Sequence, residues 1–267
     1  MVLANHVCAR AFSGDVDAVK AWLAANPRDL NEFSQTGHIE LTLLGLAVTP
    51  GAGPAMDEGK LSLVRWLVAQ GADLSIYDTN ALTPLYLALS GVGRGPKAVE
   101  TISLLLGAAP LESQIANGMT PLRSPLVHGF GLNTSHDNYS SRDVVEVVKL
   151  LLRAGAPLDD YAAFAERAGF TGESPFPADA CLTRAETMVP ALAQNEGFVE
   201  TKAMIAGVRA CGGRWSSYCR LEHKSILRLR SLTVRKRART KHKALAFLCR
   251  APNGVAWNVL SYWRATQ

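Results

Sequence analysis

The sequence lacks long apolar runs and paired cysteines. The apolar stretch LTLLGLAV, from Leu41 to Val48, is far shorter than the roughly 18 apolar residues of a membrane-spanning helix. The first residues lack the basic and apolar regions of a secretory signal. The five cysteines are scattered and form no C-x-x-C pair, which argues against a disulfide framework and favours a reducing compartment. We therefore expect a soluble protein of the cytoplasm, or of the nucleus, that does not bind membranes.

The common catalytic and metal-binding motifs are also absent. No serine-hydrolase, zinc-protease, kinase or P-loop pattern occurs. The glycine-rich stretch GVGRGP at 91–96 does not have the spacing of a dinucleotide-binding loop. Cys211, Cys219 and His223 lie close together in the sequence, but they lack the paired spacing of a zinc site. The sequence therefore predicts a protein that is not an enzyme and that holds no cofactor or metal.

Acidic residues are nearly absent from the C-terminal fifth of the chain. Residues 214–267 contain 13 Lys and Arg but only one acid, Glu222, which gives a balance of +12. Residues 1–213 contain 15 Lys and Arg against 22 Asp and Glu, a balance of −7. An asymmetry of this size indicates two parts of different character, 1–213 and 214–267.

A short sequence recurs along the first part. TPLYLA, which begins at Thr83, returns as TLLGLA from Thr42, as TPL from Thr120 and as SPF from Ser174. A threonine before an apolar segment is a good helix N-cap, and a proline at the first helical position loses no hydrogen bond there. Each copy therefore predicts the start of a helix.

An apolar segment at helical spacing follows each of the first three copies and then reaches a turn. Leu63, Val64 and Leu67 share one face of the segment after Thr42. Gly71 and Gly155 stand where a helix has to end in a left-handed conformation. The sequence thus predicts pairs of short helices, laid down several times.

This pattern resembles the ankyrin repeat, whose signature is TPLHxA in a unit of about 33 residues. The resemblance implies an all-α fold, an ankyrin-type helix-turn-helix solenoid with short hairpin fingers and a C-terminal helical cap. It divides residues 1–213 into about five units. The first is a capping unit with Asn26 in place of the stop glycine, and the last is degenerate.

The units depart from the family pattern in length and in proline content. Their starts lie 41, 37 and 54 residues apart, and the surplus falls mostly between the two helices of a unit. Pro125 predicts an early end to the first helix of the fourth unit. Pro177 and Pro190 interrupt the helical pattern of the fifth.

The resemblance implies a protein-protein interaction scaffold that binds a partner protein through finger tips and the concave groove. On this chain the implied contact residues are Ile76, Tyr77, Asp78, Thr79 and Asn80 in one finger, Gln114, Ile115, Asn117 and Met119 in the next, and Tyr86 and Arg123 at the histidine position of the signature. The acidic balance of the first part favours a partly basic partner. We expect a monomer.

A basic run, RLRSLTVRKRARTKHK, dominates the C-terminal part. Its basic patch comprises Arg228, Arg235, Lys236, Arg237, Arg239 and Lys243. Three interpretations stay open: the solvated face of a helix docked on the last repeat, a nuclear-localisation signal at RKRAR, or a patch for an acidic partner, for nucleic acid or for the acidic repeats themselves. The run contains no aromatic residue, which argues against single-stranded nucleic-acid binding.

The last residues allow an alternative function. Pro252 follows an apolar segment and precedes Val255, Val259 and Leu260, which is similar to the F-box-like tail of microbial and viral ankyrin proteins. That resemblance implies docking to the adaptor of a cullin-type ubiquitin ligase, with the repeats as the substrate receptor. The competing interpretation is a C-terminal cap that covers the end of the repeats.

Overall fold

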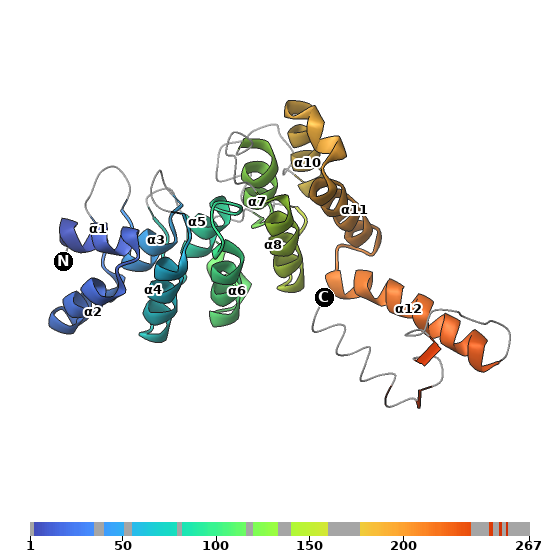
Figure 1. The fold of residues 1–267 in the computed structure, drawn as a ribbon, viewed down its shortest axis with the longest axis horizontal. Helices are drawn as coiled ribbons and strands as arrows, with labels where there is room; N and C mark the ends of the chain where they lie inside the picture. Colours follow the sequence, from blue (N-terminus) through green and yellow to red (C-terminus); the bar gives the residue numbers. More distant parts are fainter. Residues whose placement is uncertain are drawn as a thin grey trace. The chain divides into compact units, whose positions relative to one another are not determined.

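The computed structural model describes residues 3–34, 40–50, 55–78, 82–115, 120–132, 140–159 and 177–235, with residues 246, 247, 251, 252 and 255. These residues are mostly helical and include no β-strand, and a single isolated bridge joins Leu3 to Ser34 (Figure 1). The expectation of an all-α fold is therefore confirmed. The chain divides into two compact parts, Met1–Ala206 and Gly207–Gln267, whereas the charge pattern placed the boundary at 213.

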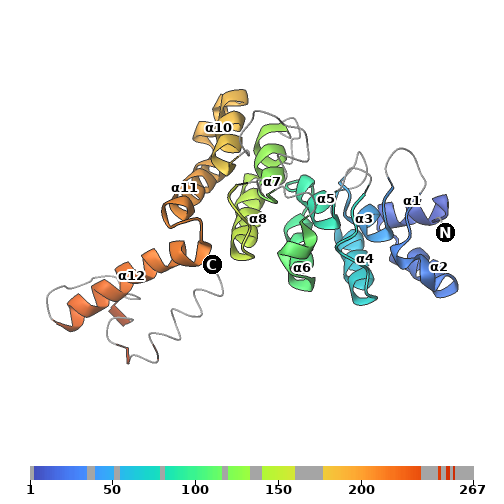
Figure 2. The ribbon, with the colours of Figure 1, turned by 180° about the vertical axis from the view of Figure 1, so that it is seen from behind.

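The N-terminal part is made of helix pairs. It contains α1 (Asn5–Ser13), α2 (Val16–Ala25), η1 (Pro27–Asn31), α3 (Leu43–Val48), α4 (Glu58–Ala69), α5 (Pro84–Ser90), α6 (Ala98–Ala108), η2 (Leu111–Gln114), α7 (Arg123–Val127), η3 (His128–Leu132), α8 (Ser141–Arg153), α10 (Ala178–Met188), η4 (Pro190–Gln194) and most of α11 (Glu196–Ala210). The first helices of the pairs contact one another in the order α1, α3, α5, α7 and α10. The second helices α2, α4, α6 and α8 form a parallel series of contacts. The pairs therefore pack side by side in two layers (Figures 1 and 2).

Threonine caps start two of the helices as expected. The hydroxyl of Thr42 accepts a hydrogen bond from the Gly45 amide at 3.1 Å, and that of Thr83 accepts one from the Tyr86 amide at 3.4 Å. Gly71 and Gly155 follow α4 and α8 with φ of 87° and 92°, so both predicted left-handed stops are confirmed.

The helix after Thr120 begins differently. A turn at residues 121–122 precedes α7, whose first residue is Arg123. Pro125 is then the third helical residue, where its missing N–H would have had no helical partner. The prediction that Pro125 ends the helix early was wrong in its mechanism: the helix starts later, and a π-helical turn, η3, continues it.

The helix ends at one asparagine and two prolines differ from the sequence prediction. Asn26 follows α2 with φ of −133°, so the prediction that it serves as a left-handed stop was wrong. Pro177 is the residue before α10, and Pro190 is the first residue of η4. Both prolines therefore begin helical segments, since proline fits the start of a helix. Ser174 lies outside the described residues.

Threonine hydroxyls also join neighbouring helix pairs. The Thr83 hydroxyl donates to the Gln114 carbonyl at 2.7 Å, and the Thr120 hydroxyl donates to the Pro157 carbonyl at 2.6 Å. Both threonines are at most 1% exposed. Each buried hydroxyl therefore holds the segment that leads to the next pair. This role was not predicted from the sequence, which indicated only helix capping.

The segments between the helices of two successive pairs interlock. The Met56 amide donates to the Arg94 carbonyl at 3.4 Å, and the Lys97 amide donates to the Met56 carbonyl at 3.1 Å. A Cβ added at Gly95 would lie 2.5 Å from the Met56 nitrogen, and one added at Gly91 would lie 2.7 Å from Pro50 Cβ. Glycine at both positions therefore allows the two segments to touch.

A buried lysine links the first two pairs. Lys60 is 0% exposed, its ammonium donates to the Thr49 carbonyl at 3.1 Å, and it lies 4.7 Å from the centroid of the Phe12 ring. Burial lowers the pKa of Lys60 below its ordinary 10.5, an effect that the Asp57 carboxylate opposes. The charged form is thus disfavoured by folding.

We expect the stability contribution of Lys60 to rise at alkaline pH. Between the lowered pKa of Lys60 and 10.5, the unfolded chain binds more protons than the folded chain, so unfolding becomes less favourable as pH rises. Lys60→Met abolishes this term. Urea unfolding of both proteins from pH 7 to 10.5 should therefore show wild type gaining stability relative to Lys60→Met. A constant difference over this range would contradict the prediction.

The C-terminal part contains the long helix α12 (Trp215–Val234). Tyr218 packs against Gly207 so closely that a side chain there would displace its ring, and the rings of Trp215 and Tyr218 have centroids 5.5 Å apart. The Arg230 guanidinium donates to the Ala251 carbonyl at 2.6 Å. These contacts fix both ends of the helix.

Candidate functional site

The segment between α4 and α5 presents the best-defined candidate surface. The Asp78 amide donates to the Leu82 carbonyl at 3.0 Å, and the Asp78 carboxylate accepts from the Leu82 amide at 2.8 Å. Two hydrogen bonds between the same residues hold the ends of the turn together. Asp78 is 6% exposed, so this predicted contact residue stabilises the turn instead of facing a partner.

Tyr77 is the exposed neighbour of that turn. Its side chain is 59% exposed, which is high for a large aromatic residue next to a buried carboxylate. Tyr77 and the half-buried Ile76 border a shallow pocket that also includes Phe33, Glu40, Leu41, Thr42, Gly45, Asp78, Leu82, Pro84 and Leu87. The volume of this pocket is about 10 Å³, whereas small-molecule sites span roughly 300–1,000 Å³.

The other side of this pocket consists of residues that the repeated pattern did not predict as contact residues. Phe33, Glu40 and Leu41 come from the segment before α3 and line the pocket together with Ile76 and Tyr77. In the sequence they precede α3 at the same spacing at which residues 74, 81 and 82 precede α5. This equivalence between repeated pairs is the signal that could have identified them.

The described residues of the second predicted finger, Gln114 and Ile115, are buried or half-buried. Gln114 is 1% exposed, and its side-chain amide donates to the Leu105 carbonyl at 3.0 Å and the Ala109 carbonyl at 2.8 Å. It therefore closes the end of α6. Ile115 is half-buried. Of the predicted finger residues, Thr79, Asn80, Asn117 and Met119 lie outside the described residues.

Tyr86 and Arg123, at the histidine position of the repeated signature, are both half-buried in the first turns of α5 and α7. Burial lowers the pKa of His128, and the positive charges of Arg94 and Arg123 lower it further. His128 is thus neutral at pH 7. Arg123 therefore lies close enough to His128 to affect the titration of this histidine.

The basic patch is described only in part. Arg228 and Arg235 are exposed on and just after α12. The others, Lys236, Arg237, Arg239 and Lys243, lie outside the described residues, as do Val259 and Leu260 of the F-box-like tail. The localisation-signal and ligase-docking interpretations stay predictions.

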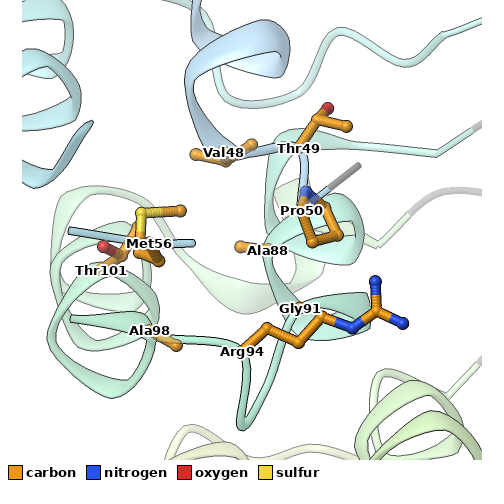
Figure 3. A pocket seen from close by; sticks show the side chains of 9 residues that line it. All are labelled: Val48, Thr49, Pro50, Met56, Ala88, Gly91, Arg94, Ala98 and Thr101. Carbon is orange, nitrogen blue, oxygen red and sulfur yellow. The ribbon is translucent and has the colours of Figure 1, made fainter. Parts of the chain in front are cut away.

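The cavity between the interlocked segments is too small for a ligand. Val48, Thr49, Pro50, Met56, Ala88, Gly91, Arg94, Ala98 and Thr101 line it, and the guanidinium of Arg94 points away from Thr101 (Figure 3). Its volume is about 10 Å³, room for about one water molecule. The Thr101 hydroxyl is buried and has no hydrogen-bond partner among the described residues, so this cavity suits a single water.

The described residues contain neither a cluster of metal ligands nor a membrane-spanning helix. No group of three or more potential metal ligands occurs among the described residues. Cys211 and Cys219 are both half-buried. Across the same residues, no helix is both long enough and apolar enough to cross a membrane. No family model matches this sequence, and no curated protein matches it.

Proposed function

We propose that the chain is a non-catalytic protein-interaction scaffold built from ankyrin-type helix pairs, and that it binds a partner protein through the surface around Tyr77. The observation that carries the proposal is the exposed Tyr77 on a turn held by Asp78. An exposed tyrosine beside apolar surface is typical of a binding hot spot, because tyrosine is enriched there.

Two features support a protein as the ligand. The pocket beside Tyr77 has a volume of about 10 Å³, so a ligand can fill it with no more than part of one side chain. The surface extends from the segment at Glu40 to α5, across two helix pairs. An extended surface with a shallow centre suits a protein partner better than a small molecule.

The charge of the surface indicates the character of the partner. Glu40 is exposed beside the pocket, and residues 1–213 carry a balance of −7. Complementary charge accelerates association and aligns the two surfaces. We therefore expect the contacting region of the partner to be basic.

Tyr77→Ala tests the proposal. Affinity purification from the cells that make the protein should retain a partner on wild type, and Tyr77→Ala should weaken that partner by about tenfold or more, since hot-spot truncation costs about 2 kcal/mol. Tm should stay within about 2 °C, because an exposed side chain contributes little to stability.

Met188→Ala is the matched control. Met188 is 54% exposed at the end of α10. This variant therefore removes an exposed apolar side chain of similar size far from Tyr77 in the sequence. Two results would overturn the proposal that this surface binds the partner. Wild type and Tyr77→Ala could retain the partner equally, or Tyr77→Ala and Met188→Ala could lose it equally.

A further inference from the structure

A second groove lies in the other helix layer, between α2 with η1 on one side and α4 on the other. Its apolar lining consists of Leu23, Ala24, Pro27, Leu30 and Trp66, with Lys20 and Gln70 at its edges. Its volume is about 420 Å³, within the range of roughly 300–1,000 Å³ for ligand sites. This groove is separate in sequence and residues from the Tyr77 surface.

Hydrogen bonds hold both walls in place. The Trp22 indole N–H donates to the Asp29 carboxylate at 3.1 Å, which fixes η1 against α2. Asn31, at the end of η1, accepts from the Asp73 amide at 2.9 Å, which ties η1 to the segment after α4. Because the walls are preformed, a ligand does not have to order them, and this lowers the free-energy cost of binding.

The groove presents one positive charge and one aromatic face. The Lys20 ammonium lies 5.7 Å from the centroid of the Trp66 ring. Among the described residues no carboxylate forms an ion pair with Lys20, and none of the residues lining the groove is acidic. The charge available to a ligand here is therefore positive, next to an apolar surface.

The groove is open on one side. Ala24, Pro27 and Gln70 are exposed, and Leu30 and Trp66 are half-buried. Small-molecule sites usually enclose most of the ligand surface, whereas a peptide lying along a helix groove contacts it on one face. The open shape therefore favours a peptide over a small carboxylate.

We propose that this groove binds a short acidic segment of a partner protein, with one large apolar side chain against Trp66 and a carboxylate on Lys20. The site is a second docking surface and does not depend on the role of Tyr77. It allows the chain to hold two partners, or two segments of one partner.

The test uses the full chain and the probe peptide acetyl-ELFDE-amide. Titration calorimetry measures affinity, and the Trp66 indole N–H signal in NMR locates the binding. We expect sub-millimolar binding that shifts this signal. Acetyl-KLFKK-amide and acetyl-EAADE-amide, which reverse the charge or remove the apolar side chains, should each bind at least about tenfold more weakly.

Two variants place the peptide. Ala24→Phe fills the groove from an exposed position and should weaken binding by about tenfold or more, while the control Ala203→Phe, on the exposed face of α11, should not. Lys20→Glu should weaken binding about fivefold. The control Arg184→Glu makes the same charge change on α10 and should leave binding unchanged.

Several outcomes would overturn the proposal. They are an absence of peptide binding at millimolar concentration, equal affinity for the three peptides, and insensitivity to Ala24→Phe. Tighter binding of 4-phenylbutyrate than of the peptide at the Trp66 signal would indicate a small-carboxylate site instead and would equally reject a peptide site. Circular dichroism of each variant excludes unfolding as the cause of lost binding.

Discussion

Gly14→Ala should destabilise the N-terminal part by about 3 kcal/mol, combining backbone strain with a steric clash. Gly14 ends α1 with φ of 77°, a left-handed conformation that alanine adopts poorly. An added Cβ would also lie 2.7 Å from the backbone nitrogen of Lys60 and 3.0 Å from the carbonyl carbon of Gly59. Backbone atoms at the start of α4 cannot rotate aside, so α1 and α4 have to separate.

Gly71→Ala separates the two contributions. Gly71 has nearly the same conformation, with φ of 87°, but a Cβ there would meet nothing within 4 Å. This control should therefore lose only about 1 kcal/mol. Urea unfolding of wild type and both variants measures the difference. Equal losses at the two glycines would show that the contact between Gly14 and α4 contributes no stability.

Phe198→Ala should cost about 4 kcal/mol, in the range for removing a fully buried aromatic ring. Phe198 in α11 and Phe130 in η3 are both 0% exposed. Their ring centroids lie 5.2 Å apart at an interplanar angle of 89°, the edge-to-face arrangement that aromatic pairs favour. The pair joins α11 to the helix pairs that precede it.

Val199→Ala is the control for this prediction. Val199 is the next residue but is 49% exposed, so its truncation should change stability by less than about 0.5 kcal/mol. A double-mutant cycle of Phe198→Ala and Phe130→Ala should give a coupling of about 1 kcal/mol. An equal loss of stability in Val199→Ala and Phe198→Ala would contradict the prediction that the buried face of α11 carries Phe198 and its exposed face Val199.

Local features of the sequence predicted the helix starts and ends well. The caps at Thr42 and Thr83 and the stops at Gly71 and Gly155 depend on a few adjacent residues. The start at Thr120 could not be predicted this way. There the Thr120 hydroxyl accepts from the Leu122 amide at 3.3 Å, within a turn, and the helix begins only at Arg123.

The candidate site was harder to predict because burial depends on neighbouring segments. The sequence placed Ile76, Tyr77, Asp78 and Gln114 in the same exposed class. In the structure Tyr77 is exposed, while Asp78 closes its own turn and Gln114 closes the end of α6. Neither the residue type nor its position in the repeated pattern distinguishes an exposed contact residue from one that is buried in its own turn.

The groove at Trp66 was not predicted at all. Lys20 and Trp66 are 46 positions apart in the sequence, and each fits the exposed side of its own amphipathic helix. Only the packing of α2 against α4 brings them together. The repeated signature contains no information about this layer, since its recurring threonines and prolines all lie near the first helix of a pair.

The contacts of Pro50 and Met56 with residues 91–97 constrain how this protein can evolve. Insertions between helices are ordinarily tolerated because each loop lies alone in solvent. Here the Met56 backbone bonds both Arg94 and Lys97, and the glycines at 91 and 95 leave no room for side chains. A change of length between Gly91 and Lys97 would therefore disturb the contacts with both Pro50 and Met56, so related sequences should keep the length of this segment.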